Sequence, residues 1–301
     1  MTLSFYDNGL RCKKKSALIV LFSFVFMLHA NAQLKPLAAA FYQNQYLINP
    51  AMAGLDGGTS FDLSYRKQLN SVPGALTEQA LTGTYAFDKA AIGLNVSNEK
   101  AGLLRRTRVL GSYAYHLQLN EKDKLHFGLS VGILNEKADE RSIKGDATDV
   151  NISRFNERGA VIDGDFGVAY TGRGITVQGA ILNLNNFMDR DKRNQMNYST
   201  FFTALSYKFN MGKQYGDVGL EPKLCYRGVK EADGIVDGGL NVTFAQDRFN
   251  VFGLYHSSEN ATFGFGIKYK TLSFSGIYSS VPHAFSGYTN GDFELGLGLR
   301  L

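Results

Sequence analysis

The sequence predicts an all-β protein: a transmembrane antiparallel β-barrel of about 14 strands, preceded by a short N-terminal segment without strand character. Two observations predict it, a secretory leader and a series of segments in which apolar and polar residues alternate. In residues 261–270, for example, Phe263 and Phe265 alternate with Gly264 and Gly266, which describes a strand with one apolar face. Because a bilayer offers no water to the backbone, such strands cross it only within a closed barrel.

The first part of the chain has the features of a secretory signal peptide. A basic region at residues 11–15 precedes an unbroken apolar run at residues 17–28, and Ala30-Asn31-Ala32 matches a small-x-small cleavage site. The apolar run is too short for a membrane helix, which needs about 20 residues. We therefore expect cleavage after Ala32 and export of the mature chain to the outer membrane.

Removal of this leader changes the charge and the cysteine content. The full chain carries 32 Lys and Arg against 27 Asp and Glu, a net charge of +5. The leader holds four of the basic residues and Asp7, which leaves about +2 on the mature chain and no argument for nucleic-acid binding. Cys12 is lost with the leader, so Cys225 is the only mature cysteine and cannot form an intramolecular disulfide.

Fourteen segments have the alternation expected of membrane strands, an even number as in single-chain bacterial barrels. They are residues 58–66, 76–87, 90–97, 104–119, 124–134, 160–171, 174–184, 198–209, 216–228, 235–245, 248–256, 261–270, 271–279 and 291–301. Two placements are less regular than the others: both ends of 104–119, and 248–256, where Phe252 and Leu254 interrupt the alternation.

The connections between these segments alternate in length. After every second segment the connection is short, as at 88–89 and 172–173, whereas 135–159 and 185–197 are long. Short periplasmic turns and long outer loops are typical of outer-membrane barrels. The short connections are therefore expected on the periplasmic side.

A soluble β-sandwich also alternates apolar and polar residues, but three features disfavour it. The predicted strands are longer than the usual soluble strand of about five or six residues. Glycines are frequent inside the strands. Tyrosines stand near strand ends, as in the interfacial girdles of membrane barrels: Tyr65, Tyr85, Tyr170, Tyr207, Tyr226 and Tyr269.

No catalytic or metal-binding pattern is found in the mature sequence. Its histidines are His116, His126, His256 and His283. His256 and Ser258 could share one face of a strand, but the sequence identifies no carboxylate partner for them. The acidic positions of the longest loop match no calcium-loop motif. We expect a protein that is not an enzyme and that has no cofactor and no metal.

The segment between the leader and the first strand carries a family resemblance. The run FYQNQYLINPAMAG at residues 41–54 resembles the N-terminal signature of the PorP/SprF family, outer-membrane proteins of the type IX secretion and gliding motility machinery of Bacteroidetes. The similarity continues through most of the mature chain, at residues 65–68, 73–75, 97–102, 113–116, 124–129 and 165–170. Leu69 stands where members often have Trp, and Gln45 where they often have Pro.

The resemblance implies a barrel similar to the 14-strand fatty-acid transporters, and an accessory role in protein secretion. Such a protein would bind the C-terminal domain of a secreted adhesin, or a lipoprotein of the secretion machine, to support export or surface attachment. Its expected partners are a secreted surface protein or type IX secretion components, together with outer-membrane lipid and no nucleic acid.

A passive channel or hydrophobic-solute transporter is the alternative. Polar residues of both charge signs are expected on the inner face of the barrel, as in a water-filled pore: Asp163, Asp165, Glu221, Lys223, Arg227, Asn241 and Lys268. The same residues are compatible with a filled interior, since residues 33–57 could fold into the lumen.

Six residues are candidate partner contacts: Asn49, Pro50, Gly54, Arg141, Arg154 and Phe155. The first three belong to the signature, and the others lie in the longest outer loop, where binding residues are common. Arginine and aromatic residues dominate interface hot spots. The expected organisation is a signal peptide at 1–32, an N-terminal periplasmic or plug segment at 33–57, and the outer-membrane barrel at 58–301.

Overall fold

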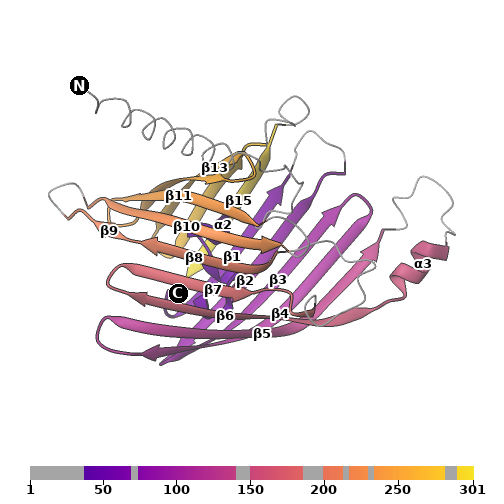
Figure 1. Ribbon diagram of the computed structural model, residues 1–301, viewed down its shortest axis with the longest axis horizontal. Coiled ribbons are helices and arrows are strands. Elements are labelled where there is room, and N and C mark those ends of the chain that lie inside the picture. Colours follow the sequence, from indigo (N-terminus) through magenta and orange to yellow (C-terminus); the bar gives the residue numbers. More distant parts are fainter. Residues whose placement is uncertain are drawn as a thin grey trace, which may run out of the picture. The chain divides into compact units, whose positions relative to one another are not determined.

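The computed structural model describes residues 37–68, 74–139, 150–185, 199–212, 217–229, 234–281 and 290–301. The strands in these ranges form one antiparallel sheet that closes on itself, because β10 pairs with β8 on one side and β11 on the other (Figure 1). The predicted signal peptide lies outside the described residues. No helix among the described residues is long and apolar enough to cross a membrane.

The strands are β1 (Thr59–Lys67), β2 (Thr77–Phe87), β3 (Ala90–Ala101), β4 (Leu104–Gln118), β5 (Asp123–Ala138), β6 (Ala160–Gly172), β7 (Ile175–Ile181), β8 (Ser199–Tyr207), β9 (Phe209–Asn210), β10 (Gly219–Val229), β11 (Ile235–Phe244), β12 (Phe249–His256), β13 (Asn260–Tyr269), β14 (Leu272–Ser279) and β15 (Asp292–Arg300). The two-residue β9 follows β8 along the same edge of β10, so the described ring has 14 strand positions. Each predicted segment corresponds to one of them. The predicted 14-strand antiparallel barrel is confirmed.

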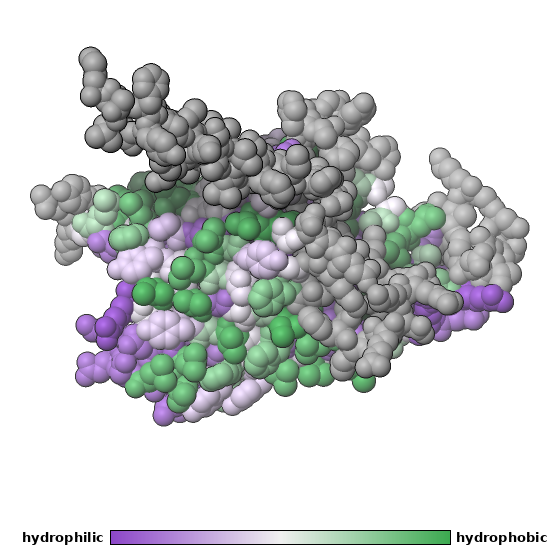
Figure 2. All heavy atoms as spheres, viewed as in Figure 1, coloured by the Kyte–Doolittle hydropathy of each residue, from purple (hydrophilic) through white to green (hydrophobic). Residues whose placement is uncertain are grey.

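The two faces of the wall differ in chemistry as the alternation predicts. On β13, Phe263 and Phe265 point outward, with 61% and 43% of their surface exposed. The residues that alternate with them, such as the buried Thr262, are small or polar and face the lumen. Figure 2 shows hydrophobic residues over the strands and hydrophilic ones at the lower left and around the helix at the right. An apolar outer band with polar ends is the surface that a lipid bilayer requires.

Tight turns connect the strands at one end of the barrel, which we call the turn end. Asp88, Arg173 and Lys270 have φ angles of 49°, 52° and 54° there, the left-handed conformation that two-residue hairpin turns require. The opposite end is the loop end, where α3 (Val150–Asn156) lies between β5 and β6. Loop-end connections are not all long: β3 continues past residue 97 to Ala101, because its pairing with β4 continues.

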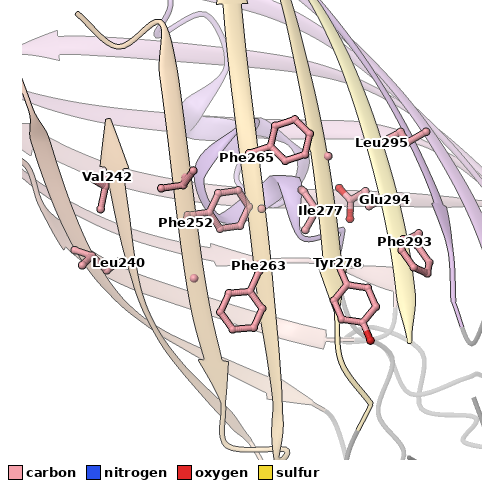
Figure 3. Close-up of a pocket in the computed structure, with 14 residues that line it drawn as sticks. Leu240, Val242, Phe252, Phe263, Phe265, Ile277, Tyr278, Phe293, Glu294 and Leu295 are labelled. Carbon is pink, nitrogen blue, oxygen red and sulfur yellow. The ribbon is translucent and has the colours of Figure 1, made fainter. Parts of the chain in front are cut away.

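The N-terminal segment lies inside the ring of strands. It contains a single helical turn, α2 (Ala39–Tyr42), and two 3₁₀ turns, η1 (Gln45–Leu47) and η2 (Pro50–Met52). At the turn end it continues into β1. Its other end reaches towards the loop end, where the Ala38 amide donates a 2.7 Å hydrogen bond to Glu294, close to the start of β15. The indigo coil behind β12–β14 in Figure 3 is this segment.

This location explains the irregular alternation of β12. Phe252 and Leu254 face the lumen and are buried in an apolar cluster with Phe41 and Ile48 of the N-terminal segment. Apolar side chains are stable at these two lumen positions because the N-terminal segment covers them with apolar side chains of its own. The strand predicted at 248–256 is present as β12, and the interruption of its alternation marks a packing surface.

An arginine on the outer face tests the register of the wall. Phe265→Arg places a charge in the lipid-facing band, where it costs about 2–4 kcal/mol near the bilayer midplane. We expect impaired assembly, measured as loss of the heat-modifiable folded species on gels. Lys268→Ala, on the opposite face of the same strand, should assemble as wild type. Equal heat-modifiability of the two variants would contradict the register.

Epitope insertion tests the orientation in the membrane. A tag inserted between Thr148 and Asn151, at the loop end, should bind antibody on intact cells. A tag inserted between Met211 and Gln214, at the turn end, should bind only after the outer membrane is permeabilised. The reverse labelling pattern would place the loop end in the periplasm.

Candidate functional site in the barrel lumen

Asn49 attaches the N-terminal segment to the wall formed by β6 and β7. It is fully buried, and its amide nitrogen donates hydrogen bonds of 3.3 Å to the Val168 carbonyl and to Gln178 Oε1. Its side-chain oxygen accepts a 3.0 Å bond from the Ala51 amide and so caps η2. Proline at the first position of such a turn needs no hydrogen bond to its nitrogen, which suits Pro50 to this place. Every polar atom of the Asn49 side chain is thus bonded inside the barrel.

Glycines in the wall make room for this turn. A β-carbon on Gly167 would stand 2.0 Å from Asn49 Oδ1, and one on Gly128 would stand 2.2 Å from the Ala51 nitrogen. On β3, two strands away from β5, a β-carbon on Gly93 would stand 2.4 Å from the hydroxyl of Tyr46. These distances are too short for any side chain. The glycines at positions 93, 128 and 167 therefore have a steric reason, the close approach of residues 46–51.

A chain of hydrogen bonds joins the end of the segment to three strands. The Ala53 carbonyl lies 3.1 Å from His116 Nε2, His116 Nδ1 lies 2.8 Å from His126 Nδ1, and His126 Nε2 lies 2.8 Å from Thr171 Oγ1. A carbonyl can only accept, so His116 carries its proton on Nε2 and accepts at Nδ1. His126 then donates through Nδ1 and accepts from the Thr171 hydroxyl. Both neutral tautomers are fixed by this geometry.

The other half of the segment lies against β10, β12, β14 and β15. Lys223 donates a hydrogen bond to the Phe41 carbonyl, and its ammonium lies 4.6 Å from the ring centre of Tyr42. The guanidinium of Arg227 lies 5.8 Å from the ring centre of Phe41. The apolar part of this surface is supplied by the buried cluster in which Phe252, Leu254 and Ile277 take part.

Beside α2, the structure joins residues that are distant in sequence. Asp237 accepts 2.6 and 2.7 Å bonds from Arg227 and lies 2.6 Å from His256 Nδ1. His256 Nε2 lies 2.9 Å from Thr262 Oγ1, which shares a 2.7 Å bond with Ser279. This Asp-His-Thr order resembles a hydrolytic triad. However, the threonine is only 1% exposed and its hydroxyl is already shared, so we interpret the network as structural.

Sequence reasoning missed this network. It considered Ser258 as the partner of His256, but Ser258 donates to Asn260. The carboxylate Asp237 lies on β11, directly opposite His256 in the sheet register. A strand pairing of 235–245 with 248–256 would have been enough to find the pair, because the turn between the two segments fixes their register.

Several residues predicted to line a pore are bonded to other residues of the protein. Arg108 donates to Asp163 at 2.7 Å and to both oxygens of Asp165 at 2.7 and 2.9 Å. Lys223 lies 3.5 Å from Glu221 in addition to its bond with Phe41. These charges face the lumen as predicted. Their partners are other wall residues or the N-terminal segment.

The six candidate partner contacts fall into two groups in the structure. Asn49 and Pro50 are buried in the lumen, and a β-carbon on Gly54 would stand 2.3 Å from the Ala91 side chain. Arg154 is exposed on α3 and Phe155 is half-buried, whereas Arg141 lies outside the described residues. Partner binding by these residues stays a prediction.

The helix α3 is held to the barrel by a neighbour of these candidates. Asn156 accepts a 2.7 Å bond from the Ala138 amide and donates a 3.1 Å bond to the Ala138 carbonyl at the end of β5. Arg158 lies 5.1 Å from the ring centre of Phe155. The helix therefore presents its exposed residues from a fixed attachment point at the loop end.

A hollow of about 830 Å³ lies on the outer wall over β11–β15 (Figure 3). Its rim is formed by outward apolar side chains such as Phe263, Phe265 and Leu295, and its floor includes Gly253 and Gly276. The strands beneath it pair without interruption. Most of its lining is apolar.

Comparison with known proteins identifies the class of this barrel. The model of the type IX secretion system membrane protein PorP/SprF family matches residues 30–299. The chain belongs to this family, as the resemblance at residues 41–54 predicts. The family and the barrel fold point to a membrane component of protein secretion and not to an enzyme.

Solved structures with a similar fold are outer-membrane barrels. The chain is 8% identical to a monoaromatic hydrocarbon channel, the TodX deltaS2S3 mutant, with 90% of this chain and 94% of that chain covered and a TM-score of 0.44. It is 10% identical to the KdgM porin, with 80% and 99% covered and a TM-score of 0.37. It is 10% identical to BamA from Haemophilus ducreyi lacking POTRA domains 1-3, with 81% of this chain and 70% of that chain covered and a TM-score of 0.39. No curated protein matches the sequence.

A side chain at Gly167 tests the fit between the segment and the wall. Gly167→Val would overlap Asn49 and Pro50, and overpacking of this kind costs about 1–3 kcal/mol. We expect the barrel to assemble while residues 37–57 become accessible to protease and the conductance of the purified protein in planar bilayers rises. Gly238→Val is the matched control, because a β-carbon there meets no atom within 4 Å. Identical protection in both variants would contradict the proposed steric fit.

Proposed function

We propose that this protein is an outer-membrane component of the type IX secretion system that acts by binding a protein partner. The partner is the C-terminal domain of a secreted adhesin or a lipoprotein of the secretion machine, and binding supports its export or its attachment to the cell surface. The proposal includes export by the leader at residues 1–32, with cleavage after Ala32.

The observation that carries the proposal is the occupied lumen. Residues 37–57 cross it, and Asn44, Tyr46 and Asn49 each hydrogen-bond to wall residues. A channel needs a continuous water-filled path, which this segment and the ion pairs of the wall oppose. The proposal therefore divides the mature chain into a plug segment at 33–57 and a barrel at 58–301.

A filled barrel can still present a binding surface at its ends. The loop end carries α3, where Arg154 is exposed and Phe155 is half-buried. Binding residues are commonly found on loops that a rigid scaffold positions. Arginines and aromatic residues frequently supply the largest share of interface energy. We assign the extracellular contact to residues 140–155, which include Arg141.

Deletion of residues 140–155 tests this assignment. The pairing of β5 with β6, on either side of the deletion, does not involve these residues, and Asn156 remains to hold Ala138. We expect a folded, heat-modifiable barrel that no longer retains or exports one partner protein. The measurement is a comparison of the surface and secreted proteomes of cells with the intact and shortened chains.

The alternative function, a passive channel or hydrophobic-solute transporter, predicts different results. It predicts unchanged surface and secreted proteomes after the deletion, and ion-conducting pores from the purified wild-type protein in planar bilayers. Those two results together would overturn the partner-binding proposal. A replacement of 140–155 by a Gly-Ser linker of the same length controls for the change in loop length.

A further inference from the structure

The surface that holds α2 differs from the one that holds η2. We call it the α2 recess and define it by Lys223, Arg227, Phe252, Ile277 and Glu294. Its centre is apolar, within the buried cluster that Phe41 joins, and its charged members stand around that centre. The η2 contact instead combines a close steric fit to glycines with the hydrogen bonds of Asn49. The two halves of the segment are thus bound by different physical means.

The recess binds the main chain of its occupant. Glu294 accepts a 2.7 Å bond from the Ala38 amide, and Lys223 donates to the Phe41 carbonyl. Every peptide offers these two groups, so neither bond requires the sequence of this chain. The side-chain requirements are an aromatic ring at the place of Phe41, beside Arg227, a second ring at Tyr42, near Lys223, and small side chains at the buried positions of Ala38 and Ala40.

The present occupant leaves one donor of the recess without an acceptor. Arg227 is 2% exposed and binds Asp237 through Nε and Nη2, but its Nη1 is buried with no hydrogen-bond partner. A buried unsatisfied donor costs about 1–3 kcal/mol. A peptide that brought a carboxylate or carbonyl oxygen to this nitrogen would satisfy it.

The conformation of α2 depends on its contacts with the recess. It is a single turn of four residues, which is too short to be stable as an isolated helix. An empty recess is unfavourable in water, because Phe252, Leu254 and Ile277 would lose their apolar cover. Release of α2 therefore favours replacement by another apolar segment over the opening of a pore. The recess lies towards the loop end, where the proposed partner surface is.

We propose that the α2 recess is an exchangeable docking site, in which residues 37–43 are replaced by a partner segment that carries an aromatic side chain and a nearby carboxylate. This proposal rests on the proposed function, since it needs a protein partner. Residues 49–57 remain in place during the exchange, held by Asn49 and the glycines of β5 and β6. The aromatic ring takes the position of Phe41, and the carboxylate binds Arg227.

A reversible crosslink tests the exchange in the full-length protein. Ala38 and Ala40 belong to the same buried cluster as Cys225, the only cysteine of the described residues. Ala38→Cys and Ala40→Cys are oxidised, and the variant that forms the bond to Cys225 is used. We expect the crosslinked form to lose about tenfold or more of the copurified partner, and reduction to restore it. Ala40→Ser should retain the partner under both conditions.

Partner retention by the crosslinked form at the wild-type level would overturn the exchange while leaving the proposed function intact. Failure of the wild-type protein to copurify any partner, together with pore formation, would instead overturn the proposed function. The two failures are therefore distinguishable.

A peptide competition needs no crosslink. The probe is a synthetic peptide that copies residues 37–44, prepared with a free C-terminal carboxylate and as the amide. We expect the carboxylate form to displace the partner from the purified complex, and its effect to fall in Arg227→Gln. A control peptide with Phe41 and Tyr42 replaced by Ser should have no effect. No displacement by any form at saturating peptide would overturn the proposal.

Discussion

The contact between the Asn49-Pro50-Ala51 turn and the glycines of β5 and β6 determines much of this structure. It requires bare backbone at Gly128 and Gly167, because any side chain there would overlap the turn. It fixes the N-terminal segment at a depth where Ala53 meets His116 and where the preceding residues reach the opposite wall. The apolar residues of β12 that face the lumen follow from that depth. This steric fit thus accounts both for the glycines of β5 and β6 and for the apolar lumen residues of β12.

The strands could be predicted from the sequence because alternation is a local property. The face of the sheet to which a side chain points depends only on its position along its own strand. Segments such as 124–134 and 261–270 can therefore be recognised as strands from their own residues. The predicted positions of the strand ends were less accurate, because pairing with a neighbouring strand extends β3 to Ala101 and β5 to Ala138. These extensions depend on the partner strand, which the single sequence does not show. The α3 turn in the longest connection was missed for the same reason, because Asn156 is fixed by Ala138.

The candidate site was only partly predictable. The sequence singled out Asn49, Pro50 and Gly54 through the family signature, and it left open whether their segment stays in the periplasm or enters the lumen. That choice depends on contacts between residues more than a hundred positions apart, such as Asn49 with Gln178. Strand glycines and the interruption at Phe252 were visible in the sequence. They indicate a packed lumen only when they are read together with the segment that fills it.

The charged residues of the lumen contribute rigidity in this arrangement. Arg108 on β4 reaches across β5 to Asp163 and Asp165 on β6, and Asp237 on β11 binds side chains from β10 and β12. The first network joins β4 to β6 across β5, and the second ties the neighbouring strands β10, β11 and β12. Ion pairs of this kind add little net stability when their desolvation is counted, but breaking one leaves a buried charge, which is costly.

The N-terminal segment adds a connection that no strand pairing can provide. Its η2 half is bound to β5 and β6, and its α2 half is bound to β10 and β15, on the far side of the ring. A closed sheet resists stretching along its hydrogen bonds, whereas flattening needs only small changes of angle between strands. A segment bound to both walls opposes flattening. While α2 occupies its recess, the segment therefore fixes the spacing between loops on opposite sides of the loop end.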